Sequence, residues 1–264
     1  MAEISAAAVK ALREQTGQGM MECKKALQEA HGDVEAARDL LRKKGLVTAE
    51  RKAHRATSEG LIAVSLDTEK TSGAMVEVRC ETDFCARNEV FRATVAKVAT
   101  LAAGGADGPI EPTPAMTAAV QEALAKIGEN MTCARAIKIS APRVGAYIHH
   151  NGKVGVLVGV EGPIEEPMLA DLCMHIAFAD PVGITTGDVP AGLVAKEREI
   201  ATAQAADSGK PPHIAEKMIA GKVAKFLAAN ALLEQPFIRD DKKKVKDVLG
   251  AVKVKAFARF AVGQ

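Results

Sequence analysis

The sequence predicts an α+β fold, in which a bundle of three helices precedes two copies of a β-β-α-α-β unit. Two changes of periodicity along the chain indicate this fold. Apolar residues recur at helical spacing up to about Gly45 and alternate from Gly60 onward, so helices give way to strands. The same succession of alternating and helical segments then appears a second time, which indicates an internal duplication.

Short helices are predicted between residues 4 and 45. Ser5 and Asp33 are suited to cap the first and third helices, and Gly17, Gly32 and Gly45 follow the three predicted ends. Three amphipathic helices of this length make only a thin core, and such modules usually dock on something. The polar stretch that follows is predicted to be a linker.

The first β-β-α-α-β unit begins with a predicted β-hairpin that alternates from Ile62 to Cys80. A helix is expected to start near Asn88, a second helix to carry Val120 and Leu124 on one face, and a strand ending near Ile139 to close the unit.

In the second unit, Asn151-Gly152 is the strongest two-residue hairpin signal in the chain. Helices are predicted from Pro167 and around Val245, and a final strand over residues 252–262. An inserted antiparallel helical hairpin is expected at about 191–228, broken near Pro211-Pro212. The predicted domains are a three-helix docking module (1–47), a linker (48–58), a first α+β subdomain (59–141) and a second α+β subdomain (142–264).

Composition excludes several classes of function. The 264 residues carry a net charge of +2 with acids and bases interspersed, so no basic surface for nucleic acid is expected. Aromatic residues make up only 3%, too few for base stacking or carbohydrate binding. No apolar stretch is long enough to span a membrane, and none forms a signal peptide. The five cysteines are scattered without a CxxC, which favours core positions in a reducing cytosol and no metal site. We expect a cytoplasmic protein.

The most informative stretch is Glu81 to Glu89, which connects a predicted strand to a predicted helix. Thr82, Asp83, Phe84 and Cys85 therefore lie in a tight loop. In such a connection Phe84 can project from a rigid base toward a partner, because an exposed aromatic is unfavourable in water unless something receives it. The alternative is that Phe84 folds back onto its own core.

Catalytic residues are not indicated. The sequence contains no GxSxG, P-loop or GxGxxG motif, and the histidines show no metal-ligand spacing. Glu81 and Asp83 share one short loop, which makes them a weak candidate for an acid–base pair. His175 is predicted to be a hydrogen-bonded core residue, and Lys242–Lys244 the solvated start of a helix.

Other candidates for contact with a partner lie outside the loop. Met20 fits the core stripe of the second helix whereas Met21 does not, so adjacent methionines suit either an adaptable docking surface or plain core packing. Arg13 lies off the apolar face of the first helix. His149 and His150 precede the Asn151-Gly152 turn, where exposure is expected.

Several motifs together resemble the elongation factor Ts family. They are VKALREQTGQGMMECKKALQEAHGDVEAARDLLRKKG, ETDFCARNEVF, AKIGEN, HNGKVGVLV, SGKPPHIAEKMIAGKVAKF and LLEQPFI, in that order along nearly the whole chain. The resemblance implies a ubiquitin-associated-like N-terminal bundle and guanine-nucleotide exchange on elongation factor Tu by protein binding, without a cofactor and without catalysis. The family usually has Val where this chain has Cys85, which would be oxidisable if exposed.

The resemblance also implies roles for residues. Thr82 to Cys85 would disturb the magnesium site of the GTPase, with Phe84 as the intruding side chain and Asp83 as its polar companion. Arg13, Met20 and Met21 would form the N-terminal docking surface, and Ile127 and His149 further contacts. A second copy of the chain is a further candidate partner. The alternative function is a non-exchange binding or dimerisation module.

Overall fold

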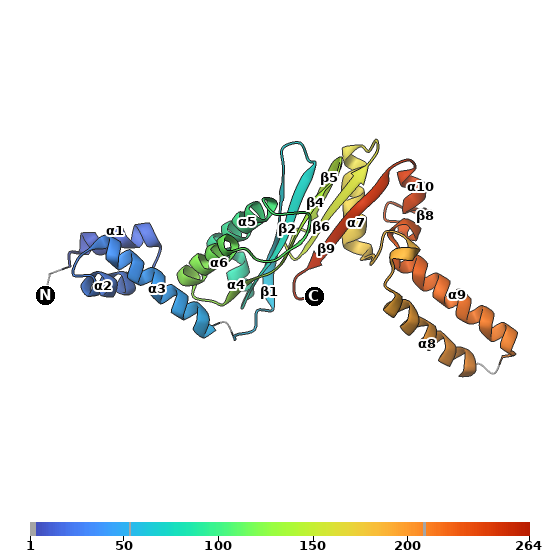
Figure 1. The fold of residues 1–264 in the computed structure, drawn as a ribbon, viewed down its shortest axis with the longest axis horizontal. Helices are drawn as coiled ribbons and strands as arrows, with labels where there is room; N and C mark the ends of the chain where they lie inside the picture. Colours follow the sequence, from blue (N-terminus) through green and yellow to red (C-terminus); the bar gives the residue numbers. More distant parts are fainter. Residues whose placement is uncertain (1–3, 53, 208–209) are drawn as a thin grey trace. The chain divides into compact units, whose positions relative to one another are not determined.

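The structure is a computed structural model that describes residues 4–52, 54–207 and 210–264. For residues 45–51 it describes the backbone only. It contains both helices and sheets, which confirms the α+β class (Figure 1). Contacts divide the chain into two compact units. Unit 1 comprises Met1–Ser65, Ala74–Lys138 and Phe260–Gln264, and unit 2 comprises Leu66–Gly73 and Ile139–Arg259.

Three helices form the N-terminal part of unit 1. They are α1 (Ala6–Thr16), α2 (Met20–Glu29) and α3 (Val34–Lys52). The predicted caps are confirmed: the Ser5 hydroxyl accepts the Ala8 N–H, and the Asp33 carboxylate accepts those of Glu35 and Ala36. A small core surrounds Leu12, Cys23 and Leu27.

The predicted end of the third helix at Gly45 is wrong, because α3 continues to Lys52. The residues after Gly45 are mostly strong helix formers by sequence (LVTAERK), and their summed propensity outweighs the roughly 1 kcal/mol that one glycine disfavours a helix. The predicted linker at 48–58 therefore begins inside a helix. The division into domains stays a prediction.

A four-stranded sheet in the order β1-β2-β4-β3 follows. Its strands are β1 (Glu59–Leu66), β2 (Ser72–Cys80), β3 (Gly108–Ile110) and β4 (Met131–Ser140). The helices between them are α4 (Asp83–Arg87), α5 (Glu89–Ala103) and α6 (Pro114–Ile127). The core includes Val76, Val78, Phe91, Val98 and Leu124. Along the chain the order is β1-β2-α4-α5-β3-α6-β4, so the elements of the predicted β-β-α-α-β order are present and α4 and β3 are elements that the pattern did not predict.

A three-stranded sheet lies in unit 2, in the order β5-β6-β9. Its strands are β5 (Arg143–Ile148), β6 (Val154–Glu161) and β9 (Lys253–Ala261), and β9 extends into the terminal segment of unit 1. Its helices are α7 (Glu166–Ala179) and α10 (Val245–Leu249). β5 and β6 pair antiparallel from Arg143↔Val160 to Ile148↔Gly155, so Asn151-Gly152 lies at a hairpin turn as predicted.

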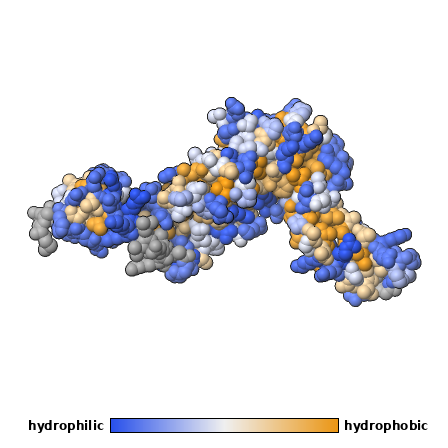
Figure 2. Space-filling view, viewed as in Figure 1, coloured by the Kyte–Doolittle hydropathy of each residue, from blue (hydrophilic) through white to orange (hydrophobic). Residues whose placement is uncertain are grey.

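The predicted insertion lies between α7 and α10. It contains α8 (Ala191–Asp207) and α9 (Pro212–Asn230), which lie side by side (Figure 1). Hydrophobic residues gather over part of this helical pair (Figure 2). The exposed large apolar side chains of α8 and α9 are Leu193, Ile200 and Ile214. Short elements flank it: η1 (Thr186–Asp188), η2 (Leu232–Glu234), β7 (Pro236–Phe237) and β8 (Asp240–Lys244).

Lys242–Lys244 belong to strand β8, so the prediction that they start a helix is wrong for Lys242 and Lys243, and only Lys244, the N-cap of α10, stands at a helix start. Their side chains are exposed, as expected. Residues 240–244 pair with Pro236 and Phe237 in a two-stranded sheet, and α10 begins only at Val245, where the side chain becomes buried. Pairing across this short ribbon outweighs the local helical pattern.

Candidate functional site

The connection between β2 and α5 contains a short helix. Thr82 is the N-cap of α4, and its hydroxyl accepts the N–H of Cys85 at 3.2 Å. The expected loop from Thr82 to Cys85 is therefore the first turn of a helix. Asn88 ends α4 and caps α5 by accepting the N–H of Val90 at 2.8 Å. The two caps fix where each helix begins.

Phe84 is 79% exposed on α4. The alternative of a core plug is therefore wrong. The next side chains along the helix, Cys85 and Ala86, point inward and join the core. Asp83 forms an ion pair with Arg87 one turn later at 3.0 Å. The helix thus presents an apolar ring beside an acid that is already paired within the same helix.

Two hydrogen bonds join Thr82 to Glu129, which follows the C-terminus of α6. The Thr82 N–H donates to Glu129 Oε2 at 3.0 Å, and its hydroxyl donates to Oε1 at 2.7 Å. Gly128 ends α6 with φ +87°, a conformation that glycine adopts readily, and the chain then turns into Glu129. The sequence motif AKIGEN contains both residues, but nothing in the motif predicts this contact.

One further hydrogen bond joins the same two turns, and Arg55 contacts both of them. Glu81 Oε1 accepts the N–H of Asn130 at 2.6 Å and lies 3.5 Å from the Arg55 guanidinium. The Asn130 side chain donates to the Arg55 carbonyl at 2.8 Å. Glu81 and Asp83 are therefore engaged with different cations, and the weak candidate for an acid–base pair is not supported.

Cys85 is buried, with 2% of its surface exposed. Its thiol pKa is raised well above the usual value, first by a hydrogen bond with the Cys80 thiol, then by burial, and further by the nearby Glu129 carboxylate. Because the thiolate is the reactive form, Cys85 is poorly reactive while α4 is folded. The condition for an oxidisable loop, an exposed Cys85, is not met.

The predicted N-terminal contact residues are all exposed. Arg13 lies on α1, and Met20 and Met21 are 47% and 61% exposed at the start of α2. The placement of Met20 in the core stripe is wrong. A helical side chain leans toward the N-terminus of its helix, so Met20 at the first position extends past the core formed by Cys23, Ala26 and Leu27.

Ile127 and His149 lie in different units. Ile127 is half-buried at the end of α6, two residues before Glu129. His149 is half-buried just after β5, where its Nδ1 lies 2.9 Å from the Tyr147 hydroxyl. The centre of its ring lies 4.2 Å from that of His150, and the two rings are tilted by 58°. The expected exposure holds for His150 only.

His175 is buried on α7, and its Nε2 lies 2.9 Å from the Gln235 side-chain oxygen. Its Nδ1 has no hydrogen-bond partner within the described residues, so the predicted hydrogen bonding is only half achieved. Burial lowers the pKa of this histidine below its usual value, and the bond to Gln235 opposes that shift.

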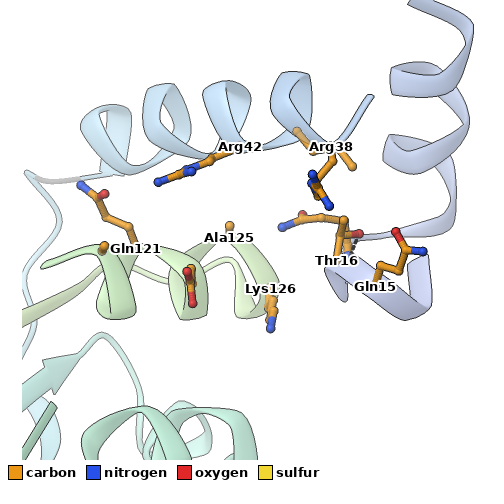
Figure 3. A pocket seen from close by; sticks show the side chains of 11 residues that line it. Gln15, Thr16, Arg38, Arg42, Gln121, Ala125 and Lys126 are labelled. Atoms are coloured by element: carbon orange, nitrogen blue, oxygen red, sulfur yellow. Dashed lines mark hydrogen bonds between the residues drawn. The ribbon is translucent and has the colours of Figure 1, made fainter. Parts of the chain in front are cut away.

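A cavity of about 360 Å³ lies between the N-terminal helices and α6 (Figure 3). Arg42 and Gln121 line it from α3 and α6, together with Thr16 and Lys126. None of the predicted contact residues lines this cavity. Arg13, Met20 and Met21 are exposed, and Ile127 and His149 are half-buried.

Over the described ranges, no group of three or more His, Cys, Asp and Glu side chains is placed to hold a metal ion. Within that part of the chain, no helix has both the length and the apolar character needed to cross a membrane.

Comparison with known proteins gives a consistent result. The family model for elongation factor Ts matches residues 81–264. The elongation factor Ts of Thioalkalivibrio sulfidiphilus is 44% identical over 272 residues, covering 99% of this chain and 92% of the relative. That of Rhodospirillum centenum is 45% identical over 291 residues (100% and 94%), and that of Aquifex aeolicus 40% over 279 residues (97% and 96%).

Fold and site define an α+β protein that displays an exposed aromatic side chain on a short, capped helix. The similarity extends over nearly the whole chain and identifies the class as a factor of translation elongation. The chain belongs to the elongation factor Ts family.

Proposed function

We propose that this protein promotes release of GDP from elongation factor Tu by binding a form of the GTPase whose magnesium and phosphate contacts are broken. The observation that carries the proposal is Phe84, which is 79% exposed on α4, a short helix that Thr82 caps and whose cap residue is bonded to Glu129. Membership of the elongation factor Ts family supports the choice of partner.

The proposed mechanism is physical rather than chemical. A GTPase holds its nucleotide through phosphate-loop amides and a magnesium ion, which is the largest local charge in the site. An exchange protein that binds best when these contacts are broken must weaken the binding of nucleotide to the GTPase. By reciprocity, bound nucleotide weakens the binding of the exchange protein by the same ratio. Insertion of Phe84 near that site would stabilise the broken form.

Phe84 is not sufficient for a large effect. Burial of one phenylalanine contributes about 1.5–3 kcal/mol, and each tenfold loss of nucleotide affinity requires about 1.4 kcal/mol. Phe84 therefore accounts for about one to two powers of ten. The remainder is assigned to other contacts, for which Arg13, Met20, Met21, Ile127 and His149 are the candidates.

The test is release of fluorescent GDP from elongation factor Tu, measured by stopped flow with increasing amounts of the factor. Phe84→Ala should slow the stimulated release by about 10- to 100-fold, the range set by loss of one buried phenylalanine. Its circular dichroism and thermal midpoint should stay close to those of the original protein, because Phe84 contributes almost nothing to the core.

Phe178→Ala is a matched control, since Phe178 is 80% exposed but lies at the end of α7 in unit 2. It should leave the release rate unchanged. If Phe84→Ala also leaves it unchanged, Phe84 does not act on the nucleotide site. If the original protein binds the GTPase without accelerating release, the alternative of a non-exchange binding module replaces the proposal.

A further inference from the structure

The turn before α4 and the turn after α6 are bonded to each other through side chains. Glu129 receives both donors of Thr82, and Glu81 in return receives the N–H of Asn130. Each turn therefore supplies one carboxylate to the neighbouring turn. Hydrogen bonds to a carboxylate are stronger than those between neutral groups, so this reciprocal arrangement, here called the Glu129 brace, resists separation of the turns.

Helix α4 needs such support. It has five residues, and a helix of this length is not stable by itself in water. Inward contacts come from Cys85 and Ala86. Its first turn depends on Thr82, whose hydroxyl accepts the Cys85 N–H while it donates its own proton to Glu129. Glu129 thus sets the orientation of the hydroxyl that caps the helix.

The position of Phe84 follows from the position of α4. With 79% of its surface exposed, the ring gains little orientation from its own packing. The Asp83–Arg87 ion pair lies within α4 and moves with it. The contacts that hold α4 against the rest of unit 1 therefore also hold the Phe84 ring. A ring that is already held in place loses less conformational entropy when it binds a partner.

We propose that Glu129 is the positioning residue for Phe84: its carboxylate holds Thr82 and the first turn of α4, so that the aromatic ring meets the partner already oriented. This inference rests on the proposed function. It adds a residue that itself need not touch the partner, and it requires a carboxylate with two acceptor oxygens at this position.

The main variant is Glu129→Gln, which keeps the shape but leaves only one acceptor atom for the two donors of Thr82. It should reduce GDP release stimulated by the factor about tenfold or more, which corresponds to loss of one hydrogen bond to a charged group. Glu122→Gln is the matched control, because Glu122 is an exposed carboxylate on α6 that pairs with Lys97 instead. The control should release GDP at the original rate.

A double-variant cycle tests whether Glu129 acts by positioning Phe84 or by its own contact with the partner. If Glu129 acts through Phe84, adding Glu129→Gln to Phe84→Ala should change the release rate by less than about twofold. Thr82→Val, which removes the hydroxyl from the other end of the bond, should resemble Glu129→Gln and serves in its place if that variant does not fold. Full additivity with Phe84→Ala, or an unchanged rate in both variants, would overturn the proposal.

A readout without the GTPase tests the brace by itself. Cys85 is shielded while α4 is in place, so its labelling by a thiol reagent, followed by peptide mass spectrometry, reports opening of this helix. Glu129→Gln should accelerate labelling of Cys85 and leave that of Cys173, buried in unit 2, unchanged. Equal labelling of Cys85 in both proteins would overturn the brace. Faster labelling in a protein that does not stimulate release would confirm the brace and reject the proposed function.

Discussion

The two β-β-α-α-β segments differ most in the connection that follows their second strand. After β2, the eight residues from Glu81 to Asn88 contain the capped helix α4 with its exposed aromatic. After β6, the four residues Gly162 to Glu165 lead directly into α7 and contain no aromatic. The same order of elements therefore carries a candidate site in one segment and a plain turn in the other.

The way each connection is held differs as well. In the first segment the turn after β2 is joined to the turn before β4 by the carboxylates of Glu81 and Glu129. In the second segment the corresponding turns approach each other through the backbone. A Cβ atom on Gly162 would lie 3.3 Å from the Ala251 carbonyl oxygen and the Val252 Cα. In the second segment, glycine allows the two turns to approach through the backbone. In the first segment, hydrogen bonds from side chains join the two turns.

This difference shows where function can be added to a repeated unit. Both segments satisfy the same packing requirements, so strand order alone carries no information about a site. The longer first connection gives room for a helix that displays Phe84, and it requires polar side chains to fix that helix. The shorter second connection requires neither.

The largest expected effect tests the central strands. β2 buries the Glu77 carboxylate between Arg79 and Arg135, each 2.6 Å away, whereas β6 is apolar up to Glu161. Glu77→Ala should lower the free energy of unfolding by about 3–5 kcal/mol, because it leaves two guanidinium groups without their shared partner. Urea denaturation, with amide exchange of β2 and β4, measures the loss.

Glu161→Ala is the control in the other central strand. Glu161 is half-exposed and pairs with Lys255 at 3.2 Å, so this substitution should cost about 1 kcal/mol or less. A loss below about 1 kcal/mol for Glu77→Ala as well would show that the buried carboxylate does not stabilise the first sheet.

A smaller effect is expected where glycine closes the second pair of turns. Gly162 has φ +113°, and an added Cβ would also press on the Ala251–Val252 backbone. Gly162→Ala should destabilise the protein by about 1–3 kcal/mol, measured as a shift of the urea midpoint. Gly221→Ala, at an open position inside α9, should instead stabilise by about 0.5–1 kcal/mol. Equal shifts for the two glycines would remove the proposed role of the close backbone approach.

The sequence predicted the strands and long helices because their apolar residues recur at a regular spacing. It did not predict α4, since five residues are too few for a period, and the cap on Thr82 becomes visible only with its partner in place. The exposure of Phe84 was one of two alternatives from sequence, because burial depends on how the chain folds around the connection.

Contacts between distant residues were inaccessible from sequence for a different reason. Glu129 is 47 residues away from Thr82, and a single sequence does not show which of its acids will meet a given turn. The extension of α3 beyond Gly45 and the strand at Lys242–Lys244 were missed because a local signal was outweighed by the neighbouring residues. In both cases, residues outside the local pattern decided whether the segment formed a helix or a strand.

The smallest expected effect compares the buried ionisable groups of the two segments. Both oxygens of Glu77 are bonded, but His175 has a partner only at Nε2. The pKa of His175 is lowered by burial, so between its folded value and about 6.5 the unfolded chain binds a proton that the folded chain does not. Stability from this group is therefore present above pH of about 6.5 and is lost as the pH falls toward the folded value.

His175→Gln keeps a hydrogen-bonding side chain without a titrating ring. It should reduce the dependence of unfolding free energy on pH between about 7.5 and 5.5 by at most about 1.4 kcal/mol per pH unit. Urea titrations of both proteins at the two pH values measure this, and equal slopes would mean that His175 takes up its proton equally well in the folded chain.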